Sequence, residues 1–283
     1  MSTIQPESPD LYDRLRTARG FVFDMDGVIF LGTKLLPGVN DLFDSLRLRE
    51  IPFLLGTNNS TATQHDFKER LAAFGVKIDT SQIQTSTTVT RDVLQSDPDL
   101  AEDAMILCVG QPSIPSILQH GTKFRILGED ADPKEADVVV AGLDFDFSYL
   151  RMTRAVEAIE HGARFIATNA DDRLPTEHGY QPGAGACIAG IATASRVQPL
   201  IIGKPEPLMM IKAADQMGLA PGEVVMVGDR LDTDILSAHR AGMMTALVLT
   251  GLTTREMLVD TDILPDFVFA DLPALLQAHT GHG

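Results

Sequence analysis

Residues 223–249 read EVVMVGDRLDTDILSAHRAGMMTALVL, and this stretch decides the fold. Residues 223–227 form a short apolar run typical of a buried strand, and residues 232–240 carry apolar side chains at helical spacing. Gly242 predicts the end of that helix, and residues 245–249 form a second apolar run. A strand, a helix and a strand in this order predict a βαβ unit with parallel strands in one sheet.

The same alternation recurs toward the N-terminus. Residues 20–23 form an apolar strand that ends at Asp24, and residues 51–55 form another that runs into a polar turn. Thr61 with Gln64 three residues later predicts a capping box at the start of the next helix. Repeated strand, turn and helix units predict the α/β class, with a doubly wound parallel sheet.

The middle third of the chain has its own strands and helices and predicts a separate small α/β unit. Strands are expected at 105–109, 137–141 and 164–168, and helices at 113–120 and 148–161. A Ser/Thr-rich segment begins at Ser81 and a Gly/Pro-rich segment ends at Ala186, and both are typical of connections. We therefore predict one unit of residues 1–84 and 183–283, with residues 85–182 inserted as a second unit on a two-linker hinge.

Composition limits the function classes. The chain has 283 residues, room for about two domains, and 44% of them are hydrophobic, enough to bury a real core. It carries 39 acidic against 23 basic residues, so its net charge is -16. A field of that sign repels phosphate backbones, and we expect no nucleic-acid partner.

The sequence predicts a cytoplasmic protein without a membrane partner. The opening stretch MSTIQPESPDLYDRL is acidic and contains proline, unlike a signal peptide, and no apolar run approaches the length of a membrane span. The two cysteines, Cys108 and Cys187, lack metal-ligand spacing and indicate a reducing compartment.

The first candidate site is the segment Asp24-Met25-Asp26-Gly27, directly after a predicted strand. Ligands of open parallel sheets bind beyond the carboxyl ends of the strands, and residues i and i+2 of an extended segment point the same way. Two carboxylates so placed can act as nucleophile and as proton donor. The pattern also occurs in calcium loops and ordinary turns, so this segment alone leaves the chemistry open.

Two further strand ends carry groups that suit an anion. Thr57 and Asn58 follow a predicted strand at the start of a predicted helix, where a hydroxyl and free N–H groups favour a phosphate oxygen, although a plain helix cap also explains them. Lys204, between Gly203 and Pro205, is held at a fixed place on the rim of the site, or is one more surface lysine.

The fourth candidate site follows residues 223–227, where Asp229, Asp232 and Asp234 come close together. Asp232 fits the N-cap of the next helix, which leaves Asp229 and Asp234 without a structural explanation. Carboxylates crowded around a phosphate repel it by about 4 kcal/mol per charge pair at 4 Å and an effective dielectric of 20. Hard oxygen ligands suit Mg²⁺, so the cluster predicts a Mg²⁺ cofactor and an anionic substrate, with Lys204 balancing the remaining charge.

The order of these four motifs resembles the haloacid-dehalogenase-like hydrolase superfamily over nearly the whole chain. The segments DMDGVIFLGTKLLPG, LLGTNNST, VVVAGLDFDFSYLRMTRA, ATNADDRLPTEHGYQPGAG and IIGKPEP resemble its p-nitrophenylphosphatase or NagD-type branch. The resemblance implies that residues 1–84 and 183–283 form a Rossmann-like core and that residues 85–182 form a large α/β cap. It also implies a phosphomonoesterase that works through an aspartyl phosphate.

The resemblance also implies a role for each matching residue. Asp24 would be the nucleophile and a metal ligand, and Asp26 the general acid and base with its backbone carbonyl on the metal. Asp229 would bind the metal directly. The remaining roles are phosphate binding by Thr57 and Asn58, orientation of nucleophile and phosphate by Lys204, and support of the metal site by Asp234.

The cap and the substrate are less well defined by the sequence. Asn169 and Asp171 lie where the cap returns to the core, and they fit either substrate contacts or hydrogen bonds within a turn. The substrate class is a small phosphorylated metabolite such as a sugar phosphate or nucleoside monophosphate, and the resemblance allows a homodimer through the cap. Two alternatives remain: a catalytically silent protein that binds phosphorylated ligands, and a phosphotransferase of the same fold.

Overall fold

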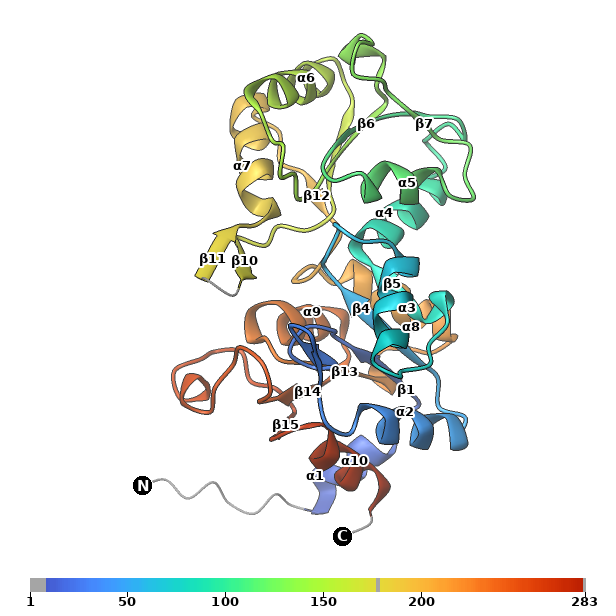
Figure 1. Ribbon diagram of the computed structural model, residues 1–283, viewed down its shortest axis with the longest axis vertical. Helices are drawn as coiled ribbons and strands as arrows, with labels where there is room; N and C mark the ends of the chain where they lie inside the picture. Colours follow the sequence, from blue (N-terminus) through green and yellow to red (C-terminus); the bar gives the residue numbers. More distant parts are fainter. Residues whose placement is uncertain (1–8, 177–178, 282–283) are drawn as a thin grey trace. The chain divides into compact units, whose positions relative to one another are not determined.

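The structure is a computed structural model that describes residues 9–176 and 179–281 (Figure 1). The chain divides into two compact units. Unit 1 consists of Met1–Thr57, Lys68–Ile83 and Pro205–Gly283, and unit 2 of Asn58–Phe67 and Gln84–Lys204. Among the helices of the described residues, none combines the length and the apolar character needed to cross a membrane.

Helices and strands mostly alternate along the described chain, and two antiparallel strand pairs are among the exceptions. The α-helices are α1 (Pro9–Arg16), α2 (Val39–Leu48), α3 (Gln64–Ala73), α4 (Ser86–Gln95), α5 (Ser113–Gln119), α6 (Tyr149–Glu160), α7 (Ala184–Ser195), α8 (Leu208–Met217), α9 (Leu236–Ala241) and α10 (Leu272–Thr280). The strands are β1 (Gly20–Phe23), β2 (Phe30–Leu31), β3 (Lys34–Leu35), β4 (Phe53–Thr57), β5 (Ile83–Thr85), β6 (Met105–Val109), β7 (Arg125–Ile126), β8 (Val138–Ala141), β9 (Arg164–Ala167), β10 (Arg173–Thr176), β11 (Gly179–Pro182), β12 (Leu200–Ile201), β13 (Val224–Gly228), β14 (Met244–Val248) and β15 (Phe267–Phe269).

The main sheet has six strands in the order β15-β14-β13-β1-β4-β5. Every pairing from β15 to β4 is parallel, as the alternation of strands and helices predicts. Strand β1 lies between β4 and β13, and Val22 at its centre is opposite Leu54 on one side and Met226 on the other. The carboxyl ends of these three strands therefore meet at one edge of the sheet.

Side chains of β1 alternate between the two faces of this sheet. Phe23 packs edge-on against Phe43 of α2, with ring centroids 5.5 Å apart. Val22 points the other way, because Gly56 of β4 lies close to both Val22 and Met209 of α8. A buried strand with helices on both faces needs apolar residues at every position, which β1 has. The predicted α/β class and doubly wound sheet are confirmed.

Unit 2 contains a second parallel sheet, with the strand order β12-β9-β8-β6-β7. Alternate residues of its central strands, such as Leu107, Val139 and Phe165, form one buried cluster with Ala155 of α6 and Ile188 of α7. The strands and helices predicted in the middle third of the chain are present.

Unit 2 includes two elements that lie C-terminal to residue 182, the predicted end of the cap. Helix α7 packs against α6, and β12 pairs with β9 in the smaller sheet. Leu200 lies opposite Ile166 in that pairing. Lys204 therefore follows a strand of the second sheet, and the chain leaves unit 2 only after it.

The predicted capping box at the start of α3 is wrong. Thr61 donates its N–H and its hydroxyl to the Asn59 side chain, at 2.8 and 2.7 Å. The reciprocal pair is Thr63 with Asp66, because the Asp66 carboxylate accepts from Thr63 N–H and Asp66 N–H donates to the Thr63 hydroxyl. The polar loop after β4 is consequently longer than expected, and the helix begins several residues beyond Thr57.

A buried histidine of α10 packs against β1. His279 of α10 is 1% exposed and meets the Phe21 ring edge-on, with centroids 5.0 Å apart. Arg49 donates to its Nδ1 at 3.1 Å, and arginine has only donors to offer, so Nδ1 carries a lone pair and the ring is neutral. Burial and the nearby cations Arg49 and Arg16 lower the His279 pKa from 6.5 to about 4.

We predict that His279→Leu flattens the pH dependence of the unfolding free energy between pH 6.5 and pH 4. The folded-state pKa lies below the unfolded value, so the unfolded chain takes up the proton first and the wild type loses stability as the pH falls through this window. The loss reaches on the order of 3 kcal/mol at the acid end. Urea unfolding of both proteins across this range measures it, and equal slopes would contradict the assignment.

Candidate functional site

Three of the predicted motifs lie at the carboxyl ends of three neighbouring strands. Asp24 directly follows β1, Thr57 is the last residue of β4, and Asp229 directly follows β13. The polar segments are brought together because β1 is paired with both other strands. Strand β1 has β4 on one side and β13 on the other. Ligands of doubly wound sheets usually bind beyond the carboxyl ends of strands at such a point.

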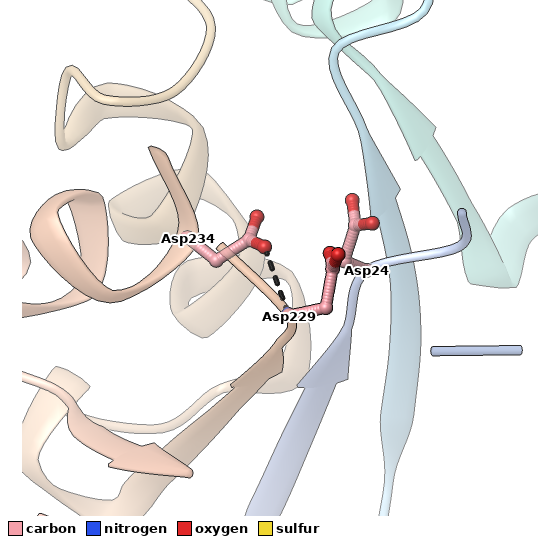
Figure 2. Close-up of side chains that lie close together, drawn as sticks. All are labelled: Asp24, Asp229 and Asp234. Carbon is pink, nitrogen blue, oxygen red and sulfur yellow. Dashed lines mark hydrogen bonds between the residues drawn. The ribbon is translucent and has the colours of Figure 1, made fainter. Parts of the chain in front are cut away.

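Asp24, Asp229 and Asp234 form a cluster at this edge (Figure 2). Each offers one carboxylate oxygen, and these three oxygens all lie within 4.8 Å of one another. The residues are 9%, 3% and 1% exposed, respectively, so water screens their charges poorly. At such separations each pair of ionised carboxylates repels by about 3 to 4 kcal/mol at an effective dielectric of 20. A divalent cation would relieve this repulsion, and an all-oxygen donor set suits Mg²⁺.

The turn after β13 explains the spacing of Asp229 and Asp234. Residues Leu231–Ile235 form a π-helical turn. The Asp234 side chain reaches back to accept from the Asp229 N–H at 3.2 Å (Figure 2) and from the Arg230 N–H at 3.1 Å. A Cβ on Gly228 would lie 2.2 Å from the Asp234 Cβ, so this turn requires glycine there. The hydrogen bonds within residues 229–234 therefore hold the Asp229 and Asp234 carboxylates in one loop.

The prediction that Asp232 caps the following helix is wrong. Its carboxylate pairs with the Arg230 guanidinium at 3.0 and 2.8 Å. The helix continues directly from the π-helical turn, and the Asp234 carboxylate accepts from the N–H groups of the two residues that precede this turn. A five-residue turn cannot be distinguished from a regular helix by apolar spacing alone.

Two glycines far apart in the chain pack against Asp229. A Cβ would lie 2.6 Å from the Asp229 side chain at Gly27 and 2.0 Å from it at Gly251. Leu252 N–H donates to Asp229 Oδ2 at 2.7 Å, and the Thr250 hydroxyl donates to the Gly27 carbonyl at 2.6 Å. Residues 250–252 therefore fix the Asp229 carboxylate, a role that their sequence did not reveal. A sequence signal for this role is their place shortly after β14, the neighbour of β13.

Asp24 and Asp26 differ in burial. Asp24 is buried, whereas Asp26 is exposed and lies in a turn closed by the bond from Gly27 N–H to the Phe30 carbonyl at 2.8 Å. Gly27 has φ +82°, a left-handed conformation that favours glycine. The exposed Asp26 carboxyl can exchange protons with solvent, and its role as the general acid stays a prediction.

The remaining candidate residues come together in unit 2. Asn58 Nδ2 donates to the Lys204 carbonyl at 2.8 Å and to the Asp171 carboxylate at 3.2 Å, and Asn169 Nδ2 donates to Asp171 at 2.7 Å. Lys204 is 2% exposed and is therefore no ordinary surface lysine. For Asn169 and Asp171 the sequence predicts either substrate contacts or hydrogen bonds within a turn. The structure shows such a hydrogen bond between their side chains.

Comparisons with known proteins identify the family of the chain. Residues 21–121 match the family described as haloacid dehalogenase-like hydrolase, and residues 201–275 match the HAD-hydrolase-like family. An acid sugar phosphatase of Staphylococcus aureus strain MRSA252 is 33% identical over 258 residues, which cover 91% of this chain and 96% of the relative.

Solved structures extend this similarity to the fold. The 4-nitrophenylphosphatase of Thermotoga maritima has a TM-score of 0.86 and 32% identity, covering 94% of this chain and 99% of that one. NagD from E. coli K-12 has a TM-score of 0.81 and 29% identity, covering 90% and 97%. The chain belongs to the haloacid dehalogenase-like hydrolases, in their p-nitrophenylphosphatase and NagD-type branch. It is an enzyme, a phosphatase that hydrolyses phosphoric monoesters.

We predict that Gly251→Ala weakens divalent-cation binding without unfolding the protein. The added methyl group would meet Asp229 Oδ2 and must push that carboxylate out of the cluster. Disturbing the groups that orient a metal ligand typically costs about 10- to 100-fold in affinity. Calorimetric titration with Mg²⁺ measures the change. The matched control is Gly128→Ala, where a Cβ meets nothing within 4 Å; equal affinities in the two variants would contradict the role of Gly251.

Proposed function

We propose that the protein is a Mg²⁺-dependent phosphomonoesterase that works through an aspartyl phosphate on Asp24. The observation that carries this proposal is the buried cluster of Asp24, Asp229 and Asp234. Three adjacent carboxylates with this little exposure are costly to ionise without a compensating cation. A stable fold had no need to collect them at the ligand-binding edge of the sheet, so their cost indicates a functional site.

The ion would be held by Asp24 and Asp229, with the Asp26 backbone carbonyl as a third protein ligand. Asp234 would support the metal site without binding the ion directly. The donor set fits, because these ligands are hard oxygens and the cluster includes no sulfur or imidazole. When bound, Mg²⁺ would screen the charge of the phosphoryl group and of the carboxylates around it.

The chain's own residues supply the bond changes. An Asp24 carboxylate oxygen attacks phosphorus, the ester P–O bond breaks, and the Asp26 carboxyl gives its proton to the departing alkoxide. Water then attacks the phosphorus of the aspartyl phosphate while Asp26 takes the proton from that water. Inorganic phosphate leaves and Asp24 is regenerated. We assign Thr57 and the Asn58 backbone to the phosphoryl oxygens, and Lys204 to the remaining negative charge.

We further propose that unit 2 supplies a cap that excludes water and selects the substrate, which is a small organic phosphate. Sugar phosphates come first among the candidates, because the Staphylococcus aureus relative is named an acid sugar phosphatase. The proposal leaves Asn169 and Asp171 as candidate contacts for the leaving group, beside the hydrogen bonds that they make.

Replacing the nucleophile should abolish turnover. We expect Asp24→Asn to lower p-nitrophenyl phosphate hydrolysis by at least about 1,000-fold, because an amide oxygen is a poor nucleophile and removes one metal ligand. The matched control is Asp41→Asn, an exposed aspartate of α2, which should retain wild-type activity. Chelation with EDTA should stop the wild type, and added Mg²⁺ should restore it.

The same assay separates the alternatives. Hydrolysis releases nitrophenol and phosphate in equal amounts, whereas a phosphotransferase releases less phosphate than nitrophenol when an acceptor alcohol is present. A silent binding protein releases neither. A folded Asp24→Asn variant with wild-type turnover would rule out the aspartyl phosphate.

A substrate panel tests the proposed substrate class. We expect the highest kcat/KM among sugar phosphates, with nucleoside monophosphates and other small phosphate esters below them. Phosphate release from equal concentrations of each compound gives the order. A preference for nucleoside monophosphates would contradict the sugar-phosphate proposal but leave the reaction itself in place.

A further inference from the structure

One side chain links two distant passages of the chain in unit 2. Asn58 begins the loop after β4, and Lys204 lies just beyond β12. Asn58 Oδ1 accepts from Lys204 N–H at 2.8 Å, and Asn58 Nδ2 donates to the Lys204 carbonyl at 2.8 Å. A single buried amide therefore binds both polar groups of the Lys204 main chain.

The Asp171 carboxylate fixes which way this amide faces. Asn58 Nδ2 lies 3.3 and 3.2 Å from the two carboxylate oxygens of Asp171. If the amide were rotated by half a turn, its oxygen would face the Asp171 carboxylate and the Lys204 carbonyl, and its NH₂ group would face Lys204 N–H. Every one of these contacts would be repulsive, so only one orientation satisfies the network.

Asp171 is in turn held on two sides. Asn169 Nδ2 donates to its carboxylate at 2.7 Å, and the Thr168 hydroxyl donates to Asn169 Oδ1 at 3.0 Å. Gly185 N–H donates to the Asp171 carbonyl at 2.8 Å, and a Cβ on Gly183 would lie only 2.2 Å from that carbonyl oxygen. The glycines at the start of α7 thus let the backbone pack tightly against Asp171.

The glycine before Lys204 allows the same close approach. A Cβ on Gly203 would lie 2.6 Å from Asn58 Oδ1 and 2.7 Å from the Thr168 carbonyl oxygen. Gly203 N–H donates to that carbonyl at 2.9 Å. The backbone of residues 203 and 204 is therefore clamped between Thr168 and Asn58.

We propose that Asn58 is a positioning residue for Lys204, and that Asp171 and Asn169 act by keeping the Asn58 amide in its one productive orientation. The inference rests on the proposed function, which gives Lys204 its part in catalysis. A lysine side chain has four rotatable bonds, so its ammonium group is placed reproducibly only if the backbone beneath it is fixed. The clamp supplies that fixed base within unit 2, where the Asn58 side chain binds the Lys204 backbone.

A double-mutant cycle tests the coupling, with p-nitrophenyl phosphate as substrate. We expect Asn58→Ala to lower kcat/KM by about 10- to 100-fold, because small displacements of a catalytic group cost this much. In a Lys204→Ala background the same substitution should have almost no further effect, because the group it positions is gone. If the two effects multiply, Asn58 acts independently of Lys204 and the proposal is overturned.

A charge swap gives a second readout that a general loss of stability would not reproduce. Asn58→Asp places a carboxylate against Asp171 and should be more damaging than Asn58→Ala. Adding Asp171→Asn restores a donor and acceptor pair at this contact and should recover part of the activity, at least about threefold over Asn58→Asp. No recovery in a folded double variant would contradict the role assigned to Asp171.

Controls separate failure of this inference from failure of the proposed function. Asn40→Ala, at an exposed position of α2, should match the wild type, and thermal unfolding reports whether each variant folds. If Asn58→Ala does not fold, Asp171→Asn takes its place in the cycle with Lys204→Ala, with the same expected result. Wild-type activity in Lys204→Ala would refute the catalytic role of the lysine. If Lys204→Ala is impaired but the losses caused by Lys204→Ala and Asn58→Ala multiply in the double variant, only the clamp is refuted.

Discussion

Repulsion among the buried carboxylates of Asp24, Asp229 and Asp234 is the constraint on which the site depends. Their oxygens lie within 4.8 Å of one another, and water has little access to them. The parallel sheet imposes this arrangement, because pairing of β1 with β13 brings Asp24 and Asp229 to the same edge. A protein that bears such a cost in its folded state gains affinity for a cation, since a bound ion removes the repulsion.

Glycine makes the crowding sterically feasible. Gly27, Gly228 and Gly251 lie at contacts where a Cβ would come within 2.6 Å of Asp229 or Asp234, and Gly203 lies at a similar contact with Asn58. The backbone can approach these polar side chains closely and present N–H groups to them, as Leu252 does to Asp229. Preorganised groups of this kind do not need to rearrange when charge develops during a reaction.

Much of the architecture could be predicted because it follows from local patterns. The apolar runs that became β1, β6 and β13 are short and bounded by turn residues, and burial on both faces leaves no polar position in β1 or β13. Local sequence patterns failed where two different backbone conformations or two candidate cap residues fit the same few positions. Thr61 and Thr63 both precede α3, and the Thr63 hydroxyl accepts from an N–H group in the first turn of the helix, which begins at Gln64. The π-helical turn at Leu231–Ile235 likewise has no signature in apolar spacing.

The sequence alone determined the alternation of strands and helices and the four polar segments that follow strands, because both depend on residues adjacent in the chain. The tertiary structure alone decided which sheet each strand joins, so that Leu200–Ile201 pairs with β9 of the smaller sheet. It also decided that Gly251 packs against Asp229 and that Asn58 binds the Lys204 backbone. These contacts join residues 22 to 146 positions apart, and only strand pairing and packing bring such residues together.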